Sequence, residues 1–122
     1  MDLSTIQPVE KEYNVQNPAD GKPTDMIVTL ACTHDPRVQQ ATRAIHDEII
    51  KAGKDLTDEK AADLDNAMAA AYIVDVRFEG DAQWKGGTPK YSKELAKEIC
   101  AITALKEQIL YEARKTRDFY KA

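Results

Sequence analysis

Residues 69–92, AAAYIVDVRFEGDAQWKGGTPKYS, decide how the helical parts of this chain are joined. The alanines give way to an apolar run that ends in Val76 and Phe78, and a loop with the only tryptophan, Trp84, follows. Because β-branched side chains lose χ1 freedom in a helix, helix propensity falls after Tyr72. We nevertheless predict that the helix before the loop continues to about residue 78, and an extended segment is the alternative.

Three helices are predicted, two before the tryptophan loop and one after it. Asp35 caps the first helix, Pro36 occupies its first position and Gly53 ends it. Thr57 caps the second helix, which leads into the quoted sequence. Ser92 caps the third helix, which runs for about 28 residues and has the most regular apolar spacing. Its apolar face consists of Leu95, Ile99, Ile102, Leu105, Ile109 and Ala113.

The N-terminal part, residues 11–32, is predicted to form a β-hairpin. Residues 13–16 alternate apolar and polar types, and residues 26–31 form a β-branched apolar run of strand length. The turn formers of residues 17–23 lie between these two strands. Since the second strand is apolar on both faces, one face needs cover beyond the helices. Either residues 1–10, otherwise a loose arm, or a partner protein supplies that cover.

These elements predict one α+β domain, mainly α, over residues 1–122. It contains three main helices, an N-terminal β-hairpin and a long C-terminal helix, with the helical part at residues 35–121. A length of 122 residues suits a single core of modest size. The long last helix would extend past such a core, which predicts that another subunit covers it.

The composition excludes several classes of partner. Apolar residues make up 43% and charged residues 31% of the chain, as is typical of a globular protein with a charged surface. A net charge of −4 and a pI of 5.2 argue against nucleic-acid binding, which favours basic surfaces. No apolar run reaches the roughly 18 to 20 residues of a membrane span, and residues 1–13 lack the features of a signal peptide. Cys32 and Cys100 are predicted to be reduced and partly buried.

The sequence predicts no catalytic site, no metal site and no cofactor. Cys32-Thr33-His34-Asp35 is the only cluster of mixed metal-ligand types, and His46 and Cys100 do not complete a zinc-binding spacing. The acidic pairs, such as Asp47 with Glu48, lie in charged helical segments, where water is expected to solvate both carboxylates. Gly86-Gly87 is too short to cradle a phosphate group. An enzymatic role is therefore not predicted.

Contact with another protein is the remaining prediction. Trp84 either closes the loop over the helices as part of the core or anchors a protein interface, where tryptophan is enriched. The candidate protein-binding residues are Val28, Leu30, Phe78, Trp84, Tyr91 and Phe119.

The chain resembles the tail assembly chaperones of long-tailed bacteriophages and prophages in three segments that cover most of its length. The first is the turn at residues 13–18 with Asp20-Gly21, followed by the apolar strand and a capped helix. The second is the alanine-rich helix at residues 67–72 with the later Trp84-Lys85-Gly86-Gly87. The third is Pro89-Lys90-Tyr91-Ser92 at the start of the terminal helix, with Gln108-Ile109 and Phe119 further on.

The resemblance implies a non-enzymatic protein of the host cell cytoplasm that is absent from the finished virion. Such proteins self-associate and hold the tape measure protein during assembly of the tail tube, and the tail tube protein is a second partner that this role allows. The alternatives are a phage head–tail connector or another small virion subunit, and, from other classes, a small enzyme or a DNA-binding regulator.

Overall fold

The computed structural model describes residues 2–121, which form an α+β domain with two antiparallel sheets. The helices are α1 (Pro36–Ala52), α2 (Asp58–Ala70), α3 (Lys93–Cys100) and α4 (Thr103–Ala113). The strands are β1 (Gln7–Pro8), β2 (Lys11–Gln16), β3 (Pro23–Leu30), β4 (Ile73–Phe78) and β5 (Tyr120–Lys121). Three short 3-10 turns are η1 (Leu3–Thr5), η2 (Gly53–Asp55) and η3 (Thr116–Phe119).

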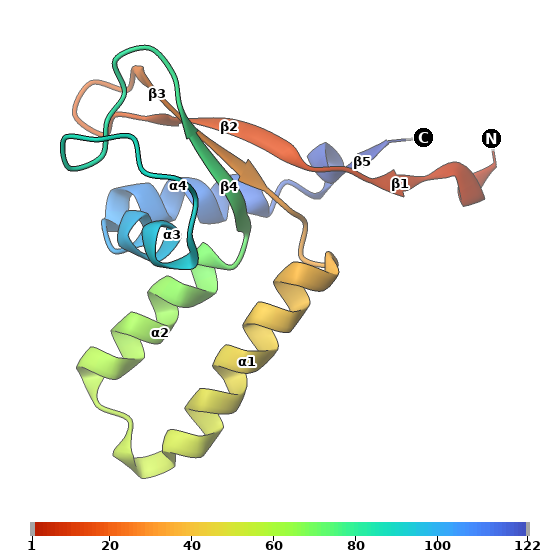
Figure 1. Ribbon diagram of the computed structural model, residues 1–122. Helices are drawn as coiled ribbons and strands as arrows, with labels where there is room; N and C mark the ends of the chain where they lie inside the picture. The colour runs from red at the N-terminus through yellow and green to blue at the C-terminus, as the bar shows by residue number, and fades with distance from the viewer. Residues whose placement is uncertain (1, 122) are drawn as a thin grey trace.

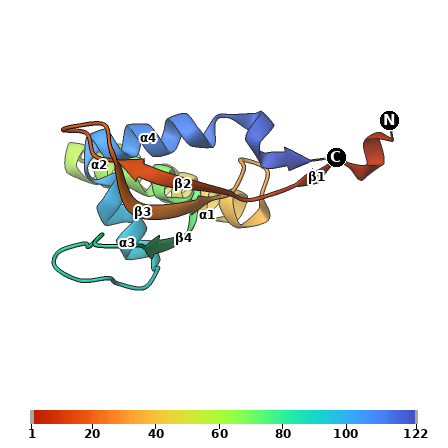
Figure 2. The same cartoon turned by 90° about the horizontal axis from the view of Figure 1, so that it is seen from above.

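The larger sheet has the strand order β2-β3-β4, and α3 and α4 pack with it around one core (Figures 1 and 2). Apolar side chains from one face of the sheet meet those of the two helices, as expected for a half-buried antiparallel sheet. The largest fully buried side chains are Phe119, Leu30, Ile73, Ile99, Ile109, Val15, Val28 and Val38.

The helices α1 and α2 form an arm that projects away from this body (Figure 1). Val38 is the only buried side chain of α1, whereas the far end of α1 exposes Ile49 and Ile50. The arm contacts the body through α2, in which Leu64 is buried and Asp63 and Asp65 pair with Lys97 of α3 and Lys106 of α4.

The outer face of the sheet carries an ion pair that spans all three strands. The guanidinium of Arg77 in β4 donates to both carboxylate oxygens of Glu12 in β2, at 2.7 and 2.9 Å. Hydrogen bonding from Arg77 lowers the pKa of Glu12. Ile27 of the central strand, the register neighbour of Arg77, is only 6% exposed on this face. The second apolar face of β3 thus receives its cover from within the chain.

The predicted helix to residue 78 is wrong, because α2 ends at Ala70 and residues 73–78 form β4. β4 pairs antiparallel with β3, with Val76 opposite Val28 and Phe78 opposite Met26. The β-branched residues of this segment fit a pleated surface better than a helix, and the open side of β3 provided a strand to pair with. The hairpin is consequently two strands of a three-stranded sheet.

The predicted long C-terminal helix and the total of three main helices are also wrong. The segment breaks at Ala101 and Ile102, where Ile102 has an extended backbone, so α3 and α4 are separate and residues 2–121 contain four α-helices. An unbroken helix of about 28 residues would be about 42 Å long and would carry part of its apolar face past the core. The break folds Ile99 and Ile109 into the same core.

The two ends of the chain meet in the smaller sheet. Gln7 pairs with Lys121 and Pro8 with Tyr120, and the amide of Val9 donates to the carbonyl of Phe119 at 2.8 Å. The segment predicted as a loose arm, residues 1–10, therefore lies against the C-terminal segment over its last part.

Candidate functional site

A groove with a volume of about 650 Å³ lies where the arm joins the body. Its walls come from α1, the end of α2, the start of β4, the start of α3 and Tyr91. Five alanines face it from the two arm helices, namely Ala41, Ala44, Ala67, Ala70 and Ala71. Because methyl side chains cannot fill the space between α1 and the body, the groove stays open beside a well-packed core.

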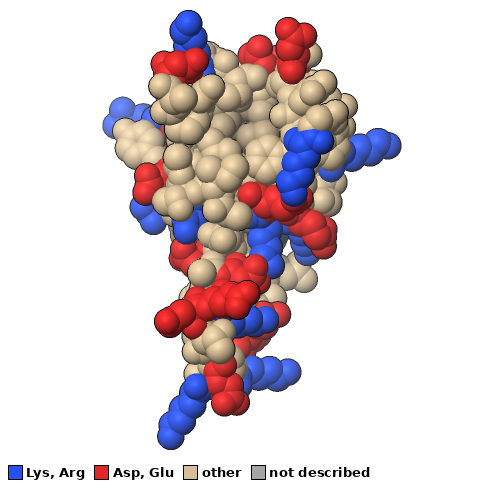
Figure 3. All heavy atoms as spheres, turned by 90° about the vertical axis from the view of Figure 1, so that its left-hand side faces the viewer, with Lys and Arg blue, Asp and Glu red and all other residues tan. Residues whose placement is uncertain are grey.

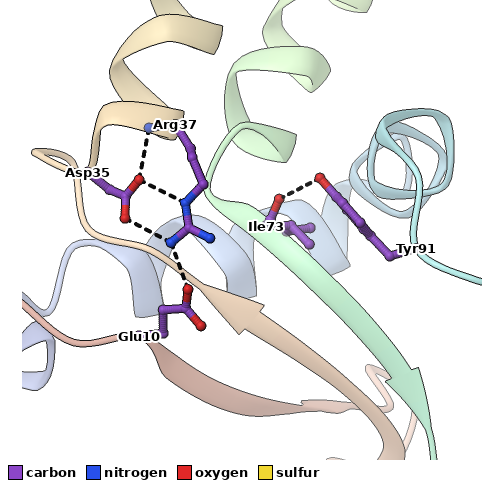
Figure 4. Close-up of polar contacts among 5 residues, drawn as sticks. All are labelled: Glu10, Asp35, Arg37, Ile73 and Tyr91. Atoms are coloured by element: carbon purple, nitrogen blue, oxygen red, sulfur yellow. Dashed lines mark hydrogen bonds and ion pairs between the residues drawn. The ribbon is translucent and has the colours of Figure 1, made fainter.

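Tyr91 forms the wall of the groove opposite the arm (Figure 4). Its hydroxyl donates a hydrogen bond of 3.1 Å to the carbonyl of Ile73, the first residue of β4. Burial raises the pKa of the Tyr91 hydroxyl, and the Asp75 carboxylate raises it further, so the hydroxyl keeps its proton at neutral pH. Tyr91 thus ties the start of α3 to the start of β4.

The rim of the groove is cationic, and most of that charge is already paired. Arg37 donates to Asp35 at 2.9 Å and to Glu10 at 2.7 Å (Figure 4). This hydrogen bonding lowers the pKa of Asp35, which also caps α1. Lys97 pairs with Asp63 at 2.8 Å. Exposed ion pairs contribute little energy, so the apolar walls rather than the rim dominate what this groove can bind.

Charged side chains are unevenly distributed over the molecule. Figure 3 shows the side of the molecule with α3 and the loop before it, where the centre of the body is mostly uncharged and charges crowd onto the arm. Charged helical surface far from the body is well solvated. On this side, contact with an apolar partner is therefore favoured on the body rather than on the outer part of the arm.

The predicted protein-binding residues do not lie together. Val28, Leu30 and Phe119 are fully buried, so their side chains form the core. Phe78 and Trp84 are half-buried against that core. Of the six residues, only Tyr91 lines the groove.

Trp84 packs on the core from a tight turn in which it pairs with Gly87. Its indole Nε1 is buried and has no hydrogen-bond acceptor among residues 2–121. The aromatic surface of Trp84, rather than its polar atom, therefore fixes the loop on the core, and the alternative that Trp84 anchors a protein interface stays a prediction.

The α1 wall of the groove was missed from the sequence. Its signal is a pair of small residues one helical turn apart, Ala41 and Ala44, in a helix that precedes another alanine-rich helix. Facing helices with small residues at this spacing present a shallow apolar surface.

Among residues 2–121, no three His, Cys, Asp or Glu side chains are grouped so that they could hold a metal ion. Cys32 is buried and the neighbouring His34 is exposed, so the candidate ligand cluster points in different directions. None of the helices within this range has the length and apolar composition needed to cross a bilayer.

Comparison with known proteins gives no relative: no family model, no curated protein and no solved structure matches this chain.

Proposed function

We propose that this protein is a tail assembly chaperone of a long-tailed bacteriophage or prophage. It self-associates and binds the tape measure protein in the host cell while the tail tube assembles, and it leaves before the virion is complete. The open groove at the root of the arm carries this proposal. Two of the three segments that resemble the chaperone family supply its walls, residues 67–72 and residues 89–92.

The shape and chemistry of the groove suit one helix of the long, helical tape measure protein. An amphipathic helix can lay apolar residues at i, i+3, i+4 and i+7 into a groove with apolar walls. The five alanines let such a helix approach closely, and Ile45 adds a larger apolar contact. Since a groove of this size engages only a few turns of helix, many copies can coat a long protein and each can still dissociate.

Filling the groove should abolish this binding. Ala44 is exposed on α1 and lines the groove, so Ala44→Trp places an indole in the space without altering the core. We expect the dissociation constant for a tape measure fragment to rise by about 100-fold or more, because the partner helix can no longer reach the wall. Fluorescence anisotropy with labelled fragments measures this change.

The matched control is Ala62→Trp, which adds the same side chain at an exposed position of α2 outside the groove. This variant should bind as the unmodified protein does. The fragments are a tiled set that covers the whole length of the tape measure protein. The proposal fails if no fragment binds the unmodified protein, or if both tryptophan variants bind equally well.

A further inference from the structure

The β4 edge of the three-stranded sheet has backbone groups without partners. The amide of Glu79 donates to the carbonyl of Asp25 at 2.9 Å, which fixes the residues of β4 that face β3. Because hydrogen-bonded and non-bonded positions alternate in an antiparallel pair, the backbones of Asp75 and Arg77 also face β3. The outward backbone groups belong to Val74, Val76 and Phe78, and none of them hydrogen-bonds elsewhere within residues 2–121.

The opposite edge of the sheet is capped at Gln16, the last residue of β2. The side-chain amide of Gln108 in α4 accepts from the amide of Gln16 and donates to its carbonyl, both at 2.9 Å. The edge of β4 away from β3 is capped at its start, where Tyr91 reaches Ile73 (Figure 4), and the loop between β4 and α3 lies on the same side (Figure 2). Beyond Ile73 the outward backbone groups of β4 have no hydrogen-bond partner within residues 2–121, so strand addition is available there.

We propose that a second copy of this chain pairs with the β4 edge, strand to strand and antiparallel, around a twofold axis at Val76. The sequence Val74-Asp75-Val76-Arg77-Phe78 is complementary to itself in this arrangement. Asp75 lies opposite the partner's Arg77, and Arg77 opposite the partner's Asp75. Val74 lies opposite the partner's Phe78, and Val76 opposite the partner's Val76. The two sheets become one continuous sheet of six strands.

The charges of Asp75 and Arg77 favour a second copy of this chain as the partner strand, and they favour one pairing register. A shift of two residues in one direction sets Arg77 opposite the partner's Arg77, and a shift in the other direction sets Asp75 opposite the partner's Asp75. Like charges directly opposite each other destabilise a strand pair, so only the register centred on Val76 is favourable. Within residues 2–121 Asp75 makes no ion pair, and the hollow that it lines also contains Glu10, Glu12 and Arg37. In the proposed register the partner's Arg77, which pairs with Glu12 and Glu79 in its own chain, also comes next to Asp75.

The apolar residues of β4 support the same contact. Val74 and Phe78 are half-buried in the single chain, with Val74 at the irregularity where β4 bends away from Leu30. Pairing with the partner's Phe78 and Val74 would remove the remaining surface of both residues from water. Backbone hydrogen bonds, two charge pairs and two apolar pairs thus coincide in one register.

This inference rests on the proposed function and names the surface through which the protein self-associates. Reversing the charges at positions 75 and 77 tests the strand pairing. Asp75→Arg gives a chain with only positive charges at positions 75 and 77, and Arg77→Asp gives one with only negative charges. Each variant alone should be a monomer of 13.6 kDa, with a dissociation constant at least about tenfold higher than that of the unmodified dimer. An equimolar mixture of the two should regain the dimer, since each position then faces its opposite charge. Analytical ultracentrifugation measures all three samples.

Two further measurements test whether the dimer forms through the β4 edge. Asp47→Arg makes the same charge change on the exposed arm and should leave the dimer intact. Amide hydrogen exchange at Val76 should slow as the concentration of the unmodified protein rises through the dissociation constant. The inference is overturned if the unmodified protein stays monomeric at 100 times the concentration used for fragment binding, or if mixing the two variants does not restore the dimer.

Failure of this inference and failure of the proposed function give different results. Asp75→Arg leaves the groove intact, so this monomeric variant should still bind tape measure fragments. If the dimer behaves as expected while no fragment binds, the proposed function fails and the strand pairing stands. If fragments bind and no dimer forms, the strand pairing fails alone.

Discussion

Phe119→Ala is expected to lower the free energy of unfolding by about 3–5 kcal/mol, the cost of removing a fully buried aromatic side chain and leaving a cavity. Phe119 has no exposed surface and is the only buried residue of η3. Its carbonyl also accepts from Val9, and the ammonium of Lys11 lies 5.8 Å from the centre of its ring. The substitution should therefore detach both β1 and β5 from the body.

Urea denaturation followed by circular dichroism measures this loss. Tyr111→Ala is the matched control, because Tyr111 is 68% exposed on α4 and its removal should change stability by no more than about 0.5 kcal/mol. Equal losses for the two variants would show that Phe119 does not anchor the C-terminal segment.

Stability should fall steeply between pH 9 and pH 12, and Cys100 should account for a large part of this fall. Burial raises the pKa of the Cys100 thiol from 9.0 to about 12. In this range the unfolded chain releases the proton and the folded chain retains it, so the folded state binds more protons and rising pH favours unfolding. The contribution is fully present below pH 9 and amounts at most to about 4 kcal/mol.

Cys100→Ala isolates this contribution. Alanine cannot ionise, so the difference in unfolding free energy between the variant and the unmodified protein should shift in favour of the variant as pH rises from 9 to 12. A small constant cost from the lost sulfur, about 1 kcal/mol, should be present at every pH. A difference that does not change with pH would mean that the thiol ionises equally well in the folded and unfolded chain.

The helix starts were predictable from the sequence because each depends on one local hydrogen bond. Asp35, Thr57 and Ser92 accept from the amides of Arg37, Lys60 and Leu95, as the capping pattern predicted. Such a bond involves residues two or three positions apart and needs no knowledge of the rest of the fold.

The two errors concern segments whose structure depends on distant partners. β4 forms because β3 has an open side, and its register is set by residues almost 50 positions earlier. The regular apolar spacing of residues 92–113 is real, since Leu95, Ile99, Leu105 and Ile109 are all buried. The apolar periodicity along the chain could not reveal the break at Ile102. The chain changes direction there, and α3 and α4 each still place their apolar residues against the core.

The candidate site was predictable only in part for the same reason. Tyr91 was identified as a residue type that is common at interfaces, and it lines the groove. Val28, Leu30 and Phe119 belong to the same apolar class but are enclosed once the third strand and the chain ends are in place. The groove exists because the alanine side chains along its walls are too small to fill the space between them. A sequence shows that alanines are present, but it does not show that the space beside them stays open.

The Gln108 side chain has a consequence for the size of any assembly. By occupying the backbone groups of Gln16, it opposes the addition of a strand at the end of β2. The proposed twofold contact would use the β4 edge in both copies at once, so further growth of the six-stranded sheet would depend on the β2 edges. There Gln108 would act against the addition of another strand.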